Sequence, residues 1–153
     1  MHHPVFVEII RHLLPLLRQH KPFASMPFSD LCDHLAWFWN RGTISYVIDG
    51  WGEPHGICIC KFFRRFEHFL WPYIHDPCGQ FVFIELLVAD EPNAIASCFN
   101  QLLERFGPQE VVMWDRGERT EEGAPRMYRW NQFEKLTKKL TYGLIEYGRQ
   151  QNS

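Results

Sequence analysis

The sequence lacks any apolar run of membrane-spanning length, and its N-terminal apolar segment is interrupted by Glu8 and Arg11. It also lacks an excess of charge, because 16 Lys and Arg residues are balanced by 18 Asp and Glu residues. The resulting net charge of −2 provides no overall field that attracts a nucleic-acid backbone or an anionic membrane. We therefore expect neither nucleic acid nor a membrane as a partner, and we expect a cytoplasmic location.

Cysteines are few, and their number, five, is odd. A secreted disulfide scaffold usually carries an even set placed in loops, whereas these cysteines fall inside apolar segments. We therefore expect reduced thiols packed in a core. Cys58 and Cys60 fall on one face of a predicted strand, where such a pair is usually packing rather than redox chemistry.

Apolar and aromatic residues, by contrast, are abundant. A hydrophobic share of 46%, with 16% aromatic residues, is typical of a globular chain rather than a disordered one. The length of 153 residues suits one ordinary domain, and the sequence shows no repeat, low-complexity tract or linker. We therefore treat residues 1–153 as a single domain.

Two helices are expected before any strand. Apolar residues from Ile9 to Leu17 follow helical spacing, and Pro15 should kink or split this first helix. Ser29 is a good N-cap for a second helix, with Asp30 in the positive first turn and a stop near Gly42.

The middle of the chain predicts a sheet. Residues 43–49 and 57–63 are β-rich and flank a turn, which indicates an antiparallel hairpin. Residues 81–89 are apolar on both faces, which marks a central strand. A helix over 93–106, capped by Asp90, should pack across this strand and a parallel neighbour at 111–114.

The last part of the chain is more polar. We expect a loop from Gly117 to Ala124, a strand from Arg126 to Trp130, and a C-terminal helix whose apolar stripe begins at Phe133. The fold class is therefore α/β with an α+β layout, in which helices flank a central mixed sheet.

From Phe28 to Trp130 this order of elements resembles the GNAT superfamily of acyl-CoA acyltransferases. The string from Phe83 to Asn93 is similar to the central strand and turn of the toxin-activating lysine acyltransferases, where a carboxylate sits at the position of Glu85. The resemblance implies transfer of an acyl group to an amine-bearing substrate. The donor it implies is acyl-CoA or an acyl carrier protein.

The resemblance also implies where the donor binds. Backbone groups of Leu87, Val88 and Ala89 would lie beside the acyl carbonyl, and Asn93 would lie at the cofactor. The turn at 90–93 nevertheless departs from the glycine-rich phosphate loop of GNAT enzymes. Two carboxylates repel a pyrophosphate and Pro92 removes an amide donor, so this turn predicts weak binding of free CoA.

Glu85 is the leading candidate for a general base. It interrupts an apolar strand, where desolvation would raise the pKa of its carboxylate toward a useful value. The alternative is a structural carboxylate paired with an Arg or a hydroxyl, or one at a surface-reaching end of the strand. The toxin-activating enzymes also use a histidine before their second helix, and residues 25–28 provide none.

Two further residues are candidates for catalysis. Tyr128 is a candidate general acid for the thiolate leaving group, and its alternative is a packing tyrosine flanked by cations. Asp115 follows the predicted strand at 111–114, and the carboxyl ends of such strands face the usual ligand crevice. Its alternative is a turn-capping aspartate.

Neither a metal nor a classical nucleophile is expected. His68, His75, Asp76 and Cys78 lie near one another in sequence, but their spacing matches no established zinc pattern. Acyl transfer also has an alternative, which is that the chain is a non-enzymatic GNAT-like domain that binds a protein partner.

Overall fold

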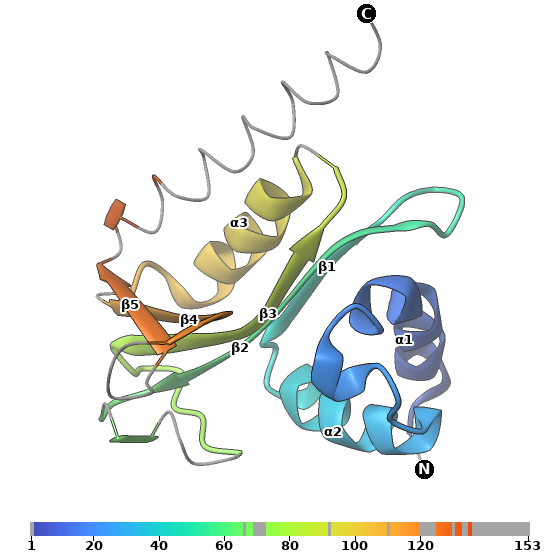
Figure 1. The fold of residues 1–153 in the computed structure, drawn as a ribbon, viewed down its shortest axis with the longest axis horizontal. Coiled ribbons are helices and arrows are strands. Elements are labelled where there is room, and N and C mark those ends of the chain that lie inside the picture. The colour runs from blue at the N-terminus through green and yellow to red at the C-terminus, as the bar shows by residue number, and fades with distance from the viewer. Residues whose placement is uncertain are drawn as a thin grey trace, which may run out of the picture.

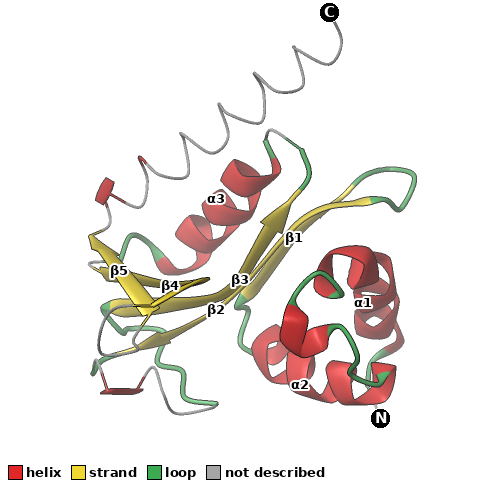
Figure 2. Ribbon diagram, in the orientation of Figure 1, coloured by secondary structure: helices red, strands yellow, loops and turns green. Residues whose placement is uncertain are grey.

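The computed structural model describes residues 2–65, 67–68, 73–91, 93–109, 111–119, 125–129, 131–132 and 135. For residues 111–119 and 125–128 it describes the backbone. The chain forms a mixed α+β fold in which helices cover both faces of one sheet (Figures 1 and 2). Within the described residues no helix is long and apolar enough to cross a membrane.

Helix α1 (Pro4–Leu17) begins at a histidine cap, because the Nδ1 atom of His3 accepts a hydrogen bond from the Val5 amide at 3.1 Å. Pro4 occupies the first turn, where its missing N–H costs nothing. Pro15 lies in the last turn, and the helix continues past it for two residues rather than splitting. A short 3₁₀ helix, η1 (Lys21–Phe23), then leads to the second helix.

Helix α2 (Phe28–Asn40) starts before the predicted cap. Its N-cap is Pro27, whose carbonyl accepts the first helical bond from the Leu31 amide, and no side chain caps this end. The prediction of Ser29 as the cap is therefore wrong. Asp30 lies in the first turn, as predicted.

The sheet has five strands in the order β1–β2–β3–β4–β5. These are β1 (Ile44–Ile48), β2 (Pro54–Phe63), β3 (Phe81–Ala89), β4 (Val111–Arg119) and β5 (Pro125–Arg129). The hairpin of β1 and β2 is antiparallel, β3 is central, and β3 and β4 are parallel neighbours, so these three predictions are confirmed.

Strand β4 is longer than predicted. It continues through Gly117 to Arg119, where it still pairs with β5, so the expected loop from Gly117 is wrong at its start. Pairing with a neighbouring strand outweighs the polar composition of this segment. The predicted C-terminal helix from Phe133 falls largely outside the described residues.

Helix α3 (Ala94–Phe106) connects β3 to β4 but packs mainly against β1 and β2. Its placement over the parallel pair was therefore predicted wrongly. Arg105 donates to the carbonyls of Gly42 and Ile44, and the Gln101 amide donates to the Tyr46 carbonyl at 3.0 Å. These bonds hold the helix over the β1 edge of the sheet.

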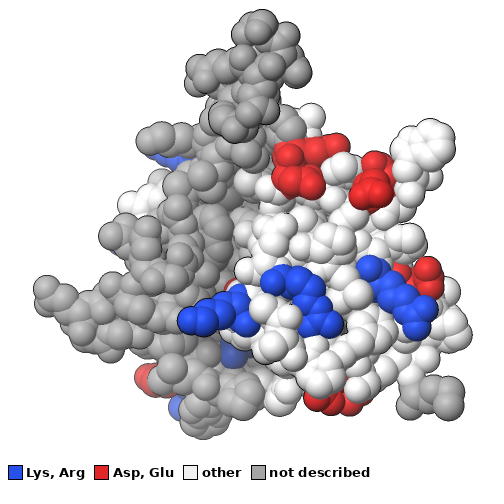
Figure 3. All heavy atoms as spheres, turned by 45° about the vertical axis from the view of Figure 1, so that its right-hand side comes forward, with Lys and Arg blue, Asp and Glu red and all other residues white. Residues whose placement is uncertain are grey.

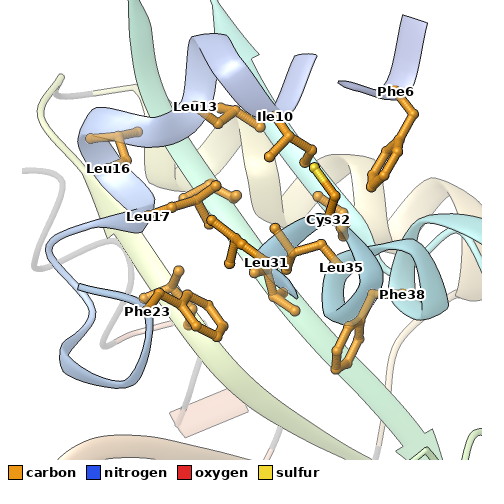
Figure 4. Packing of buried hydrophobic residues seen from close by; sticks show 14 residues of the cluster. Phe6, Ile10, Leu13, Leu16, Leu17, Phe23, Leu31, Cys32, Leu35 and Phe38 are labelled. Atoms are coloured by element: carbon orange, nitrogen blue, oxygen red, sulfur yellow. The ribbon is translucent and has the colours of Figure 1, made fainter. Parts of the chain in front are cut away.

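Two apolar cores result, one on each face of the sheet. The larger core joins α1, η1 and α2 to the sheet, and Figure 4 shows its side chains pointing toward one another in front of the strands. The smaller core lies under α3 and contains Cys58, Cys60 and Cys98. The thiols of the chain are free, and four of the five are buried. Cys78 is exposed, so for that residue the expectation of a core thiol is wrong.

Candidate functional site

Glu85 lies at an irregularity in the middle of β3. On β2, Ile59 pairs with Leu86 and Cys60 pairs with Ile84, so Glu85 is an additional residue in its strand. Such a β-bulge changes the side on which the following side chains lie. Ile84 therefore packs in the core under α3, whereas Leu86 packs in the core under α1 and α2.

The bulge coincides with the point at which β3 and β4 part. Their described pairing runs from Phe81 opposite Val111 to Ile84 opposite Trp114. Beyond Ile84, β3 continues with β2 as far as Ala89, and β4 continues with β5 as far as Arg119. From Glu85 onward, the edge of β3 toward β4 has no partner strand among the described residues.

The predicted donor-binding residues lie on this unpaired part of β3. The Leu87 side chain packs against the core under α3, and the Val88 side chain packs against the core under α1 and α2. Their side chains are therefore committed to packing. For a ligand, the backbone groups from Leu87 to Ala89 that point away from β2 are the candidates, and their predicted role at the acyl carbonyl stays a prediction.

Glu85 faces a histidine of helix α2. The Nε2 atom of His34 lies 3.8 Å from the Oε1 atom of Glu85, and the two side chains are 24% and 29% exposed. This distance is too long for a hydrogen bond. The Nε2 atom is nevertheless buried and has no hydrogen-bond partner among the described residues. A carboxylate and an unsatisfied imidazole nitrogen thus face one another beside the unpaired edge of β3.

Tyr73 contacts the opposite side of the same imidazole. Its hydroxyl lies 3.3 Å from the Nδ1 atom of His34, and its ring packs against Trp37 with a centroid distance of 5.5 Å. Among the described residues other than glycine, Tyr73 alone has a positive φ, at 57°. Tyr73 therefore lies at Nδ1 of His34, and Glu85 lies on the Nε2 side of the ring.

A buried cation completes this cluster. Lys61 pairs with Phe83 across the strands, is 8% exposed, and places its Nζ atom 5.6 Å from the Phe83 ring centroid. Burial lowers the pKa of Lys61, and the carboxylate of Glu85 opposes that shift. The site therefore combines groups that accept protons with a positive charge in a partly dry setting, which suits proton transfer.

The turn after β3 forms a second polar cluster. The Nε2 atom of His55 lies 2.8 Å from Asp49, and its Nδ1 atom lies 3.0 Å from Asp90 and 3.1 Å from Glu91. The hydrogen bond to Asp49 raises the pKa of His55, with the two later carboxylates acting in the same direction. Asp90 thus pairs with His55 rather than capping α3, and its predicted capping role is wrong.

The cap of α3 is Asn93, and its side chain makes no capping hydrogen bond. Asn93 was predicted to contact the cofactor, and its position at a helix N-terminus is compatible with that role. Two carboxylates precede it in the turn, with side chains about half exposed at 54% and 51%. Two carboxylates at this helix end disfavour a pyrophosphate there.

Asp115 and Tyr128 are described only through their backbones. Asp115 lies within β4, one residue past the last pairing with β3, rather than beyond the end of its strand as predicted. Tyr128 lies in β5 opposite Val112. Their side chains lie outside the described part of the structure, so their catalytic roles stay predictions.

Analysis of the sequence missed His34. The residue lies on the apolar stripe of α2, three positions after Leu31 and four before Phe38, both of which are buried. A histidine on the core-facing stripe of an amphipathic helix is the signal that could have found it.

The sequence predicted no zinc site in the segment around His75, because the spacing there matches no established zinc pattern. There the Nδ1 atom of His75 accepts a hydrogen bond from the Phe62 amide at 3.2 Å, and Asp76 pairs with Arg64. No group of three or more His, Cys, Asp or Glu side chains in the described ranges is arranged to hold a metal ion.

The chain matches no family model, no curated protein and no solved structure. What this site does is therefore inferred from its own chemistry.

Proposed function

We propose that the chain is a GNAT-like acyltransferase that moves an acyl group to an amine, with Glu85 and His34 as its proton-accepting pair. The observation that carries the proposal is the position of Glu85. It lies in a bulge of the central strand, it faces an unsatisfied imidazole nitrogen, and the β3–β4 pairing ends beside it.

The reaction needs one net proton transfer from nitrogen to sulfur. The amine nitrogen attacks the carbonyl carbon of a thioester, an N–C bond forms, and the C–S bond breaks to release a thiolate. Glu85 takes the proton that the nitrogen loses and becomes a neutral acid, and the Nε2 atom of His34 is the second proton acceptor of the pair. The thiolate takes up a proton, which is the role predicted for Tyr128.

The edge of β3 from Leu87 to Ala89 that faces away from β2 supports the donor side of this proposal. Backbone groups on a strand edge that has no partner can bond the acyl arm of a donor and polarise its carbonyl. The carboxylates of Asp90 and Glu91 favour a protein-borne donor over free CoA, since they disfavour a pyrophosphate at the α3 N-terminus. We therefore infer an acyl carrier protein as the preferred donor class.

The test is an acyl-transfer assay with acetyl-CoA, a long-chain acyl-CoA and an acylated carrier protein, each with an amine acceptor. Glu85→Gln keeps the shape of the side chain and removes its charge, so the transfer rate should fall by about 10²-fold or more. The matched control is Glu104→Gln, which removes an exposed carboxylate on α3 and should leave the rate unchanged.

Circular dichroism should show that both variants fold. Transfer at the parental rate by Glu85→Gln would remove Glu85 from the mechanism. A folded parent chain that transfers from none of the three donors would favour the alternative, a non-enzymatic GNAT-like domain that binds a protein partner.

A further inference from the structure

Trp51 stands at the tip of the hairpin between β1 and β2 with 92% of its surface exposed. The other exposed large apolar residues of the described chain, Val5 and Tyr73, reach only 56% and 53%. A tryptophan in water forgoes a large gain from burial, since its ring is among the largest apolar surfaces a residue offers. Its exposure is therefore the most prominent apolar feature of the described surface.

The backbone that carries Trp51 is held firmly. One carboxylate oxygen of Asp49 accepts hydrogen bonds from the amides of Trp51 and Glu53, at 2.8 and 3.0 Å. The Asp49 amide donates to the Glu53 carbonyl, and the Gly52 amide donates to the Asp49 carbonyl. The tip is thus a closed turn rather than a loose loop, as Asp side chains promote.

The tip is also fastened to the rest of the fold from two sides. The His12 Nδ1 atom of α1 lies 3.0 Å from the Gly52 carbonyl oxygen. Gly52 has a φ of 82°, and an added Cβ there would lie 2.9 Å from the His12 ring. On the other side, His55 links Asp49 to the turn after β3. Because these contacts already hold the backbone at Trp51 in place, a partner that binds Trp51 has little additional chain to order.

The surroundings of Trp51 are acidic. Glu53 is exposed beside it, Asp49 lies beneath it, and Asp90 and Glu91 lie across the His55 cluster. In Figure 3 acidic side chains gather in the upper part of the face shown, whereas Lys and Arg side chains form a row lower on it. An anionic membrane would be repelled by these carboxylates, which leaves a cationic partner as the complement.

We propose that the β1–β2 tip is a docking surface for a cationic segment of a protein partner. An Arg or Lys side chain of that segment stacks on the Trp51 indole, and its neighbouring cations pair with Glu53 and Glu91. The indole face attracts a cation through its quadrupole, and the carboxylates set the sign of the charge that is accepted. This docking role is independent of acyl transfer at Glu85.

The test titrates the full chain with a labelled peptide of alternating Arg and Ala, at physiological salt, and follows fluorescence anisotropy. A peptide of alternating Glu and Ala tests whether the tip selects cations, and it should bind more weakly than the Arg peptide. Trp51→Ala should weaken binding of the Arg peptide about tenfold, and Trp51→Phe should weaken it less because a ring remains. Glu53→Gln with Glu91→Gln should weaken binding and reduce its dependence on salt.

Val5→Ala, at another exposed apolar residue, is the matched control and should bind the Arg peptide as the parent does. Circular dichroism should show that all variants fold. Equal affinity of parent and Trp51→Ala for the Arg peptide, or no binding up to millimolar peptide, would overturn the proposal. So would partition into zwitterionic lipid vesicles that depends on Trp51 while the peptide does not bind, because the tip would then be a membrane contact.

Discussion

The two faces of the sheet are both covered by helices, yet they differ in chemistry. Under α1 and α2 the strands carry Lys61 and Glu85, and the helices add His34. Under α3 the strands and the helix contribute the thiols of Cys58, Cys60 and Cys98. Burial raises the pKa of the Cys98 thiol to about 12, so it stays protonated and unreactive near neutral pH.

This difference shows where the fold can do chemistry. The face under α3 is mainly an apolar layer, and the Gln101 and Arg105 side chains of the helix donate hydrogen bonds to backbone carbonyls at the β1 edge. The face under α1 and α2 combines the larger core with groups that titrate, next to the strand edge that β4 leaves unpaired. The larger core and the groups that we propose to transfer protons therefore lie on the same side of the sheet.

The first prediction tests which face contributes more to stability. Leu35→Ala on α2 removes a fully buried side chain from the larger core and should lower the free energy of unfolding by about 2–5 kcal/mol. Cys98→Ala removes one buried sulfur under α3 and should cost less. Urea denaturation of both variants measures the difference. A larger loss of unfolding free energy for Cys98→Ala would show that the face under α3 contributes more to stability.

The second prediction concerns the tightest contact under α3. A Cβ added at Gly56 would lie 2.9 Å from the Cβ atom of Ala94 and 3.3 Å from the Cys98 sulfur. Gly56→Ala should therefore push α3 away from β2 and lower stability by about 1–3 kcal/mol. Gly50→Ala is the matched control, since nothing lies within 4 Å of its added Cβ.

Gly50→Ala should change the free energy of unfolding by no more than about 0.5 kcal/mol. Equal effects of the two glycine substitutions on the free energy of unfolding would show that close packing of α3 against Gly56 does not contribute to stability. Thermal and urea denaturation of the pair provide the comparison.

The third and smallest effect is the pH dependence of the His55 cluster, which joins the hairpin to the turn after β3. Neutral histidine has a single N–H, so only the protonated ring can donate to Asp49 and to Asp90 or Glu91 together. The pKa of His55 is raised in the folded chain, chiefly by the hydrogen bond to Asp49. Its contribution to stability is thus complete below the unfolded pKa of about 6.5.

That contribution is lost as the pH rises through the folded pKa of His55. The same hydrogen bond is the main cause that lowers the pKa of Asp49, so on the acid side the contribution is present above about pH 3.9 and is lost as the pH falls through the lowered value. Parent and His55→Gln should therefore differ more in stability at pH 5.5 than at pH 8.5. A difference that grows with pH would contradict this assignment.

Several parts of the fold could be predicted because they depend on local pattern. Strand β3 was predicted with the residues it has, since an apolar run on both faces requires cover on both sides. The end of α3 at Gly107 follows from a glycine with a φ of 74°. Helix starts were predicted less well, since Ser29 and Asp90 are good caps in isolation and other residues occupy those positions.

The sequence by itself determined the mixed layout, the hairpin, the central strand and the carboxylate at Glu85, because hydrophobic period and turn residues act over a few neighbours. Only the tertiary structure decided that a bulge directs Glu85 toward His34 and that His55 joins three carboxylates. These partners are 51 positions apart in the first case and up to 36 in the second. Such contacts depend on strand register and helix placement, which no local pattern encodes.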